Sequence, residues 1–216
     1  MDVLVTGGSG YIGARLIRTL VERGHAVRAL VRPGSGHRVP RGATLVQGDA
    51  LDARSVGQAL RAGDTLVHLV GTPHPNPRKD ALFEAVDLAS IEATVAAART
   101  LAIAHLVYVS VAHPAPVMQA YVAARVRGEA AIRAAALTST ILRPWYVVGP
   151  GHWWPLALAP LYTVLEWVPG TRGSARRLGL VTLAQMVRAL VAAVENPPAP
   201  GQQRFVDVPG IRAAVD

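Results

Sequence analysis

Three glycines spaced three residues apart near the amino terminus constrain the fold more than any other feature of the sequence. They lie in the segment Thr6-Gly7-Gly8-Ser9-Gly10-Tyr11-Ile12-Gly13, between an apolar run typical of a strand and a run with helical spacing. The first glycine permits a tight turn, the second lets the backbone approach a pyrophosphate, and the third lets the helix pack closely on the strand. Free N–H groups at the start of the helix can then hold the phosphates. The segment therefore predicts a dinucleotide-binding turn.

The rest of the chain alternates between short apolar runs and amphipathic stretches. We expect strands at residues 3–6, 26–31, 44–47, 64–70, 105–111, 138–142 and 204–208, and helices at 11–23, 52–60, 80–101, 117–136 and 183–195. Gly24 is a typical helix C-terminal glycine, and Asp52 and Thr182 are typical N-caps. Because strands that alternate with helices form parallel sheets covered on both faces, the sequence predicts an α/β fold of the Rossmann type, with a doubly wound parallel sheet.

The length of 216 residues fits one such domain. We expect residues 1–216 to form a single NAD(P)-binding domain, in which residues 144–216 contribute a small lid on the substrate side. No apolar leader with a basic start precedes the first strand, which favours a cytoplasmic protein. The sequence leaves monomer and homodimer open.

Composition excludes several kinds of site. The chain has no cysteine, so disulfides, thiolate metal sites and cysteine nucleophiles are absent, and we expect no metal. The net charge of +8 comes from 22 basic and 14 acidic residues, and Lys79 is the single lysine. These basic residues form no block, so we expect no nucleic-acid partner. The positive charge would suit an anionic phosphate ligand or a membrane surface. The alternative is a compositional bias toward Arg and Ala without functional meaning. No other feature of the sequence supports membrane contact.

The end of the second expected strand distinguishes NADP from NAD. An NAD site usually carries Asp or Glu there, which accepts from the ribose hydroxyls. This chain has Val31 followed by Arg32, with His37, Arg38 and Arg41 nearby. Because a guanidinium can pair with a 2′-phosphate, we predict a preference for NADP(H), with NAD(H) as the alternative. The alternative for Arg32 is a solvated loop residue.

Several further segments resemble the extended and atypical short-chain dehydrogenase/reductase superfamily, especially its branch of small NAD(P)-binding proteins similar to NmrA and to the 39-kDa accessory subunit of respiratory complex I. In order, they are Thr6–Gly13, Gly48-Asp49, His68-Leu69-Val70-Gly71, Val109-Ser110, Tyr121–Arg125 and Leu142-Arg143-Pro144 through Gly149-Pro150, across about two-thirds of the chain. The resemblance implies that Asp49 and Ala50 contact the adenine. It also implies that Val70 and Gly71 line the adenosine and pyrophosphate, and that Pro144 and Val147 meet the nicotinamide.

Active members of the superfamily carry a Tyr-x-x-x-Lys pair on a helix and a Ser or Thr from the preceding strand. The segment Tyr121-Val122-Ala123-Ala124-Arg125 keeps the spacing, which places both ends on one helix face, but not the lysine. The resemblance implies Tyr121 as proton donor, Arg125 as ribose clamp and Ser110 as the residue that fixes the substrate oxygen. Since a guanidinium does not replace a compact ammonium, a Tyr121 that packs on the cofactor without reacting is the alternative.

Three other residues near this segment carry expectations. His68 lies inside an apolar strand, and we interpret it as structural. His113 is a second candidate proton donor. Glu129 is expected to hold Arg125 or Arg133 at helical spacing.

An aromatic segment follows Arg143 and contains all four tryptophans, Trp145, Trp153, Trp154 and Trp167, together with Tyr162. In the superfamily this region lies over the substrate, so Trp145, His152 and Trp153 are candidate substrate contacts, in a lipophilic cavity. A membrane interface and an ordinary hydrophobic lid are the alternatives. The apolar run of about 16 residues, broken by prolines, is too short for a transmembrane helix, which needs about 20.

Three functions are consistent with these residues. The first is an NADP(H)-dependent oxidoreductase that acts on a small apolar carbonyl or quinone-like compound. The second is a redox sensor or assembly factor that binds NADP(H) without turnover, which the arginine at position 125 favours. The third is a nucleotide-sugar epimerase or dehydratase, for whose usual substrate domain the chain is short.

Overall fold

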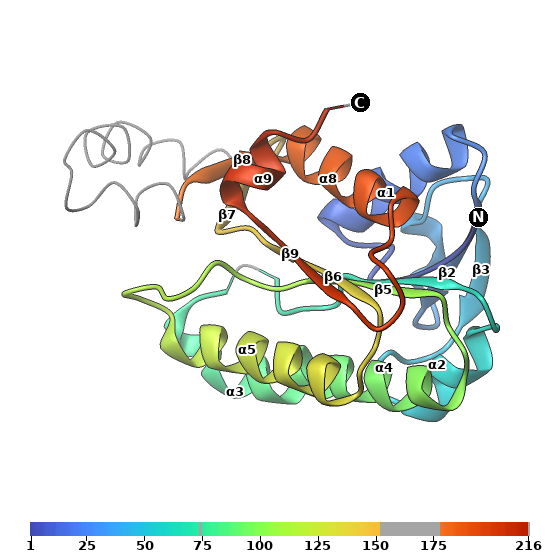
Figure 1. Cartoon of the computed structure of the whole chain (residues 1–216), viewed down its shortest axis with the longest axis horizontal. Coiled ribbons are helices and arrows are strands. Elements are labelled where there is room, and N and C mark those ends of the chain that lie inside the picture. Colours follow the sequence, from blue (N-terminus) through green and yellow to red (C-terminus); the bar gives the residue numbers. More distant parts are fainter. Residues whose placement is uncertain (74, 152–177, 216) are drawn as a thin grey trace.

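The computed structural model describes residues 1–73, 75–151 and 178–215 (Figure 1). The strands are β1 (Asp2–Thr6), β2 (Ala26–Val31), β3 (Thr44–Gln47), β4 (Thr65–His68), β5 (His105–Val109), β6 (Ser139–Arg143), β7 (Tyr146–Val148), β8 (Leu180–Thr182) and β9 (Gln203–Asp207). The longer helices are α1 (Tyr11–Glu22), α2 (Ala53–Ala59), α4 (Ala89–Thr100), α5 (Gln119–Ala134) and α8 (Leu183–Glu195). Short helical turns are η1 (Gly36–Arg38), η2 (Pro77–Lys79), α3 (Asp80–Leu82), η3 (Phe83–Leu88) and α9 (Val208–Arg212).

Seven parallel strands form the main sheet in the order β3-β2-β1-β4-β5-β6-β9. The chain therefore moves outward from β1 to β3, returns to β4 beside β1, and then continues outward the other way. This reversal makes the edge beyond the carboxyl ends of β1 and β4 the usual ligand crevice of such a sheet. The predicted α/β, doubly wound parallel fold is confirmed.

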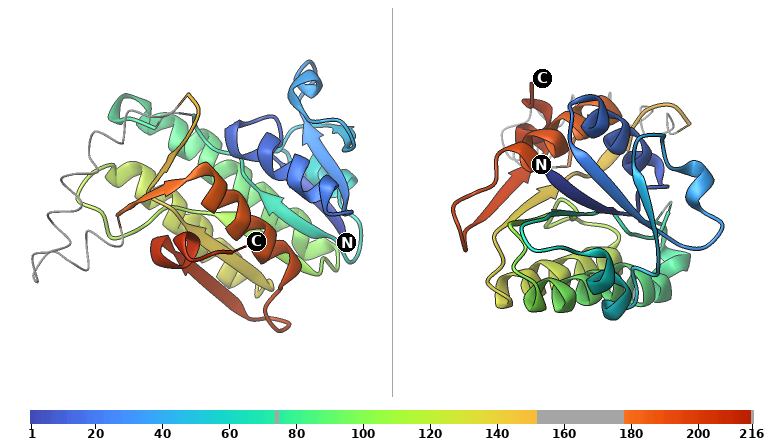
Figure 2. Two further views of the ribbon diagram at one scale, coloured as in Figure 1. Left: turned by 90° about the horizontal axis from the view of Figure 1, so that it is seen from above. Right: turned by 90° about the vertical axis from the view of Figure 1, so that its right-hand side faces the viewer.

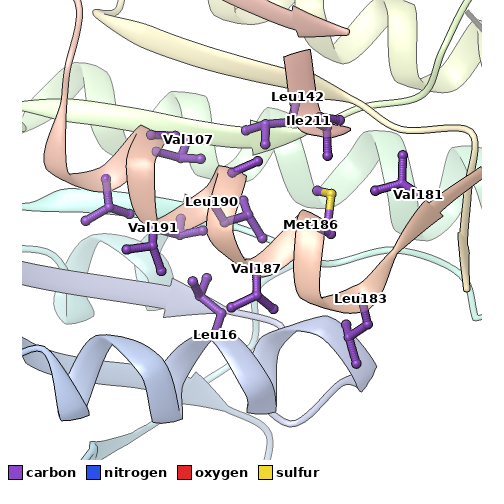
Figure 3. Close-up of a cluster of buried hydrophobic side chains, with 14 of the residues drawn as sticks. Leu16, Val107, Leu142, Val181, Leu183, Met186, Val187, Leu190, Val191 and Ile211 are labelled. Atoms are coloured by element: carbon purple, nitrogen blue, oxygen red, sulfur yellow. The ribbon is translucent and has the colours of Figure 1, made fainter. Parts of the chain in front are cut away.

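Helices cover both faces of the sheet. Figures 1 and 2 show α1 and α8 on one face, and α2, α3, α4 and α5 on the other. Each face has its own cluster of buried apolar side chains. On α8 the predicted apolar stripe is buried, and it packs toward Leu16 of α1 and Val107 of β5 (Figure 3). Thr182 caps α8 in a capping box with Gln185, which fixes where the helix begins.

Several elements are shorter than predicted. The strand expected at 64–70 pairs only to His68, and the one expected at 105–111 only to Val109. The helix expected at 117–136 begins at Gln119, because Met118 has a left-handed backbone with φ of 59°. Residue 208 starts α9 and does not continue the last strand. The helix expected at 80–101 is interrupted by the π-helical turn η3, a departure with consequences for the site.

Residues 178–215 contribute both to the main sheet and to one of the helical layers. β9 pairs with β6 as the last strand of the main sheet, and α8 completes one helical layer. β7 and β8 form a separate two-stranded parallel sheet. The lid predicted for residues 144–216 stays a prediction, and most of its aromatic segment, residues 152–177, lies outside the described residues.

Candidate cofactor and catalytic site

The glycine turn is fixed by steric contacts of its backbone. Gly7 has a left-handed φ of 75°, and a Cβ there would lie 2.8 Å from the carbonyl carbon of Leu69. A Cβ on Gly13 would lie 2.3 Å from the carbonyl oxygen of Gly7, so α1 could not approach β1 this closely with any side chain at that position. These two contacts are the physical reason why glycine stands at the first and third positions of the motif.

The second glycine faces outward. Gly10 is exposed and precedes α1, and its N–H donates to the carbonyl oxygen of Gly7 at 3.0 Å. No acidic side chain lies in the first turn of α1. The first N–H groups of this 12-residue helix thus present a partial positive charge without a competing carboxylate, which suits a pyrophosphate.

The predicted adenosine contacts lie at the same edge, beyond β2 and β3. Arg32 follows Val31 and is exposed. The side chain of Asp49 accepts from the backbone N–H of Leu51 at 3.0 Å, which fixes the turn that contains the half-buried Ala50. Arg32, Asp49 and Ala50 therefore share the carboxyl edge with the glycine turn, and their contacts to a cofactor stay predictions.

The loop after β4 lies beside the glycine turn. Val70 and Gly71 are half-buried, and Thr72 is buried. Both polar groups of Thr72 donate to Oδ2 of Asp87, the N–H at 3.0 Å and the hydroxyl at 2.6 Å. Asp87 lies in η3 and is fully buried. Asp87 could not be identified from the sequence, because Asp80, Glu84 and Glu92 in the same expected helix look equally exposed.

Arg125 is a buried cation with defined partners. Its Nη2 donates to Oδ1 of Asp87 at 2.6 Å, and its Nη1 to the carbonyl oxygen of Val109 at 3.0 Å. The guanidinium carbon lies 5.3 Å from the ring centre of Tyr121 and 5.8 Å from that of Tyr108. Burial opposes the charge, while Tyr121, Tyr108 and Asp87 favour it, and together they raise the pKa of Arg125 above its ordinary value. Arg125 is therefore a permanent cation beneath the site.

Tyr121 is half-buried on α5, with its ring 5.1 Å from that of Phe83. The predicted helix face is thus present, since Tyr121 and Arg125 lie together as the four-residue spacing requires. Whether Tyr121 donates a proton stays a prediction.

The expectation for Glu129 is wrong. Its carboxylate accepts from Arg143 at 3.0 and 2.5 Å and from the hydroxyl of Ser110 at 2.6 Å, while Arg125 pairs with Asp87 instead. His113 Nε2 lies 3.5 Å from the same carboxylate. Burial opposes the charge on Glu129, but the bonds from Arg143 and Ser110 outweigh it and lower the pKa of the carboxyl. Glu129 faces inward, where a strand arginine offers two donors; Arg133 on its own helix is exposed.

This arrangement bears on the role predicted for Ser110. The residue is buried, and its hydroxyl gives its one proton to a carboxylate. A serine that fixes a substrate carbonyl needs that proton for the substrate. The role of Ser110 stays a prediction, and the proposal below depends on Tyr121 instead.

His68 makes the structural contacts expected of it. Its Nδ1 lies 3.1 Å from the Thr6 hydroxyl and 3.0 Å from the Thr94 hydroxyl, and its Nε2 lies 3.2 Å from the Ser90 hydroxyl. Burial, with a smaller contribution from Arg125, lowers the pKa of His68 to about 3. The ring is therefore neutral at neutral pH and connects β1, β4 and α4.

The predicted nicotinamide end follows β6. Pro144 is buried, and its carbonyl oxygen accepts from the N–H of Ala112 at 2.9 Å. Val147 and Trp145 are half-buried and pack against the core, and the Trp145 ring lies 5.4 Å from that of Tyr146. His152 and Trp153, the other candidate substrate contacts, lie outside the described residues.

The described residues contain neither a metal-binding group nor a membrane-spanning helix. Residues 1–73, 75–151 and 178–215 contain no group of three or more His, Cys, Asp or Glu side chains arranged to hold a metal ion. Within the same ranges, no helix combines the length and the apolar character needed to cross a membrane.

The reversed strand order, the glycine turn and the uncovered start of α1 together define a Rossmann-type protein that holds a dinucleotide. A family described as NAD(P)H-binding matches residues 7–149, and the chain belongs to that family. The family match confirms the NAD(P)-binding part of the prediction, and a solved protein of the short-chain dehydrogenase/reductase superfamily shares the fold.

Relatives and solved structures add to this assignment. The chain is 27% identical over 197 residues to ceramide reductase from Caulobacter vibrioides, covering 90% of this chain and 61% of that protein. It is 30% identical over 173 residues to 2-alkyl-3-oxoalkanoate reductase from Stenotrophomonas maltophilia, covering 70% and 52%. A short-chain dehydrogenase/reductase superfamily protein from Agrobacterium tumefaciens, solved with bound NAD, has a TM-score of 0.69 at 19% identity, covering 95% and 77%. The chain thus spans 61% and 52% of the two curated relatives.

Proposed function

We propose that the protein is an NADP(H)-dependent oxidoreductase that reduces a carbonyl group on a small apolar molecule. The observation that carries the proposal is the position of Tyr121, half-buried on α5 with the Arg125 guanidinium 5.3 Å from its ring, at the sheet edge that also holds the glycine turn. When bound, NADPH would supply a hydride for the carbonyl carbon. The phenol of Tyr121 gives its proton to the carbonyl oxygen, and the products are the alcohol and NADP⁺.

The preference for NADP(H) over NAD(H) rests on Arg32. It directly follows β2, is exposed, and has no carboxylate at the neighbouring strand end, which is Val31. A guanidinium there supports binding of a 2′-phosphate and offers nothing to the ribose hydroxyl pair of NAD. Parallel titrations with NADPH and NADH, followed by nicotinamide fluorescence, test this preference. Arg32→Ala should weaken NADPH binding alone, and Arg99→Ala, which removes an exposed arginine from the last turn of α4, serves as the matched control.

The substrate class rests on two supports. The half-buried Trp145 and Val147 give the predicted nicotinamide end an apolar lining. Two relatives are named ceramide reductase and 2-alkyl-3-oxoalkanoate reductase, and the second name describes a 3-oxo compound with an alkyl substituent. We therefore propose a carbonyl or quinone-like compound with an alkyl or prenyl substituent.

Tyr121→Phe tests the chemistry. The variant should bind NADPH as the wild-type protein does and lose at least a hundredfold in turnover with long-chain 3-oxo compounds or alkylated quinones, because the proton donor is absent. Equal turnover in the two proteins contradicts the role of Tyr121. Binding without turnover in the wild-type protein contradicts the activity and favours the sensor or assembly factor.

A further inference from the structure

Asp87 joins three elements through one buried carboxylate. Its Oδ1 accepts from Arg125 of α5, and its Oδ2 accepts from both the N–H and the hydroxyl of Thr72, which follows β4. Asp87 is 0% exposed and Arg125 5%. A π-helical turn places this carboxylate; π turns inside helices are rare and often occur at functional sites.

The ion pair lies directly beneath the loop that borders the glycine turn. A Cβ on Gly71 would lie 2.1 Å from Nη2 of Arg125 and 3.0 Å from Oδ1 of Asp87. On the other side of this loop, a Cβ on Gly7 would lie 2.9 Å from the carbonyl oxygen of Leu69. Residues 69–72 are thus held between the glycine turn above and the Asp87–Arg125 pair below.

We propose that Asp87 is a positioning residue of the cofactor site, which fixes the loop of residues 69–72 through Thr72 and fixes Arg125 beneath Gly71. Arg125 then acts on a bound dinucleotide through Asp87 and the loop, and not as a free cation. A buried ion pair adds little to stability compared with apolar side chains of the same shape, whereas loss of one partner leaves an uncompensated charge. We therefore expect the Asp87–Arg125 pair to fix the position of the loop more than it stabilises the fold. The proposal rests on the dinucleotide site of the proposed function and is independent of turnover.

Thr72 offers the cleanest test, because its hydroxyl contacts Asp87 and not Arg125. Thr72→Val keeps the shape and the ion pair but removes the 2.6 Å hydrogen bond. We expect a three- to tenfold higher Kd for NADPH, measured by nicotinamide fluorescence, since one hydrogen bond to a charged group is lost. Thr72→Ser retains the hydroxyl and should restore the wild-type Kd. A merely structural role predicts a lower Tm for Thr72→Val with an unchanged Kd, and that result overturns the proposal.

A charge cycle tests the pair itself. Asp87→Asn and Arg125→Gln should each weaken NADPH binding at least tenfold, and the double variant should bind no worse than either single variant, because both act on one loop. Glu84→Gln is the matched control: it removes a carboxylate from the same π turn, where Glu84 pairs with Arg127 in solvent, and should leave the Kd unchanged. Additive losses in the double variant contradict the proposal. If Asp87→Asn does not fold, the Kd values of Thr72→Val and Thr72→Ser for NADPH test the proposal by themselves.

The proposed activity and this inference fail in different ways. A wild-type protein that binds NADPH without reducing any carbonyl overturns the activity, while a higher Kd in Thr72→Val still supports the positioning role. A wild-type protein that binds neither NADPH nor NADH overturns both.

Discussion

The two halves of the carboxyl edge are built in different ways. Around β1 and α1 the site is made of backbone, and its geometry depends on glycines that no side chain can replace, as the 2.3 Å approach at Gly13 illustrates. Around β5 and α5 it is made of side chains: Arg125 stands at the lysine position of the Tyr-x-x-x-Lys pattern that the sequence resembles, and Asp87 balances its charge at 2.6 Å. In the backbone half, no second substitution can make room for a side chain in place of a glycine. In the side-chain half, residues can be exchanged if the buried charges remain paired.

The largest expected effect is on the backbone half. Gly13→Ala places a Cβ against the Gly7 carbonyl oxygen, so the turn must open, and we expect binding of NADPH and NADH to weaken at least a hundredfold. Gly57→Ala in α2 is the control, because a Cβ there would lie 3.9 Å from the Cβ of Ala97, which is an ordinary contact away from the glycine turn. Fluorescence titration together with Tm measures both. A Gly13→Ala protein that folds and binds like the wild type would break the comparison.

The next effect belongs to the side-chain half and concerns stability. Glu129→Gln removes the charge that accepts from Arg143 and Ser110, and we expect the free energy of unfolding to fall by about 2 to 3 kcal/mol. Cofactor binding should change less than threefold, because Glu129 and Arg143 are not among the predicted cofactor contacts and the predicted contact Ser110 keeps its hydroxyl. Ser110→Ala, which removes one hydrogen bond, should cost about 1 kcal/mol. Urea unfolding checks both, and a Kd that rises more than tenfold in Glu129→Gln contradicts a purely structural carboxylate.

The smallest expected effect is on the pH dependence of stability. It concerns His68 of β4, a strand that lies between β1 and β5. Burial lowers the pKa of His68 to about 3, while the unfolded chain binds this proton below about 6.5. The native state excludes the proton in that window, so stability is full above pH 6.5 and falls on acidification by about 1.4 kcal/mol per pH unit. His105, with a pKa lowered by burial to about 4, adds to the same slope. Urea midpoints between pH 7.5 and 5 should fall less steeply in His68→Gln than in the wild type; His37→Gln, an exposed histidine, is the control.

The fold could be predicted because its signals are local and repeated. The spacing of apolar residues and the capping residues predicted the helices and strands. The structure confirms the caps: Asp52 accepts from two helix N–H groups, Gly24 has φ of 81°, and Thr182 forms a capping box. The glycine turn could be predicted for the same reason, since a single stretch of eight residues carries its steric logic.

The side-chain half could not be predicted, because its partners come from distant positions. Helical spacing suggested that Glu129 holds Arg125, but the structure pairs Arg125 with Asp87, 38 residues away, and Glu129 with Arg143, 14 residues away. The π turn that directs Asp87 inward cannot be recognised from the spacing of apolar residues. That spacing predicts one continuous helix over residues 80–101. Buried charges choose the partner that the packed layers bring closest, and only the folded chain defines that choice.

The packing of α8 on α1 also orders events during synthesis. Arg23, at the end of the helix that begins at the glycine turn, forms two hydrogen bonds to Glu195 at the end of α8, across 172 positions of the chain. A ribosome therefore releases the complete dinucleotide turn long before it releases the helix that shields the apolar back of α1. Until then the packing between α1 and α8 is absent, and transiently exposed apolar surface of this kind makes an incomplete chain prone to aggregation. Contacts of such long range also slow the final closure of the domain.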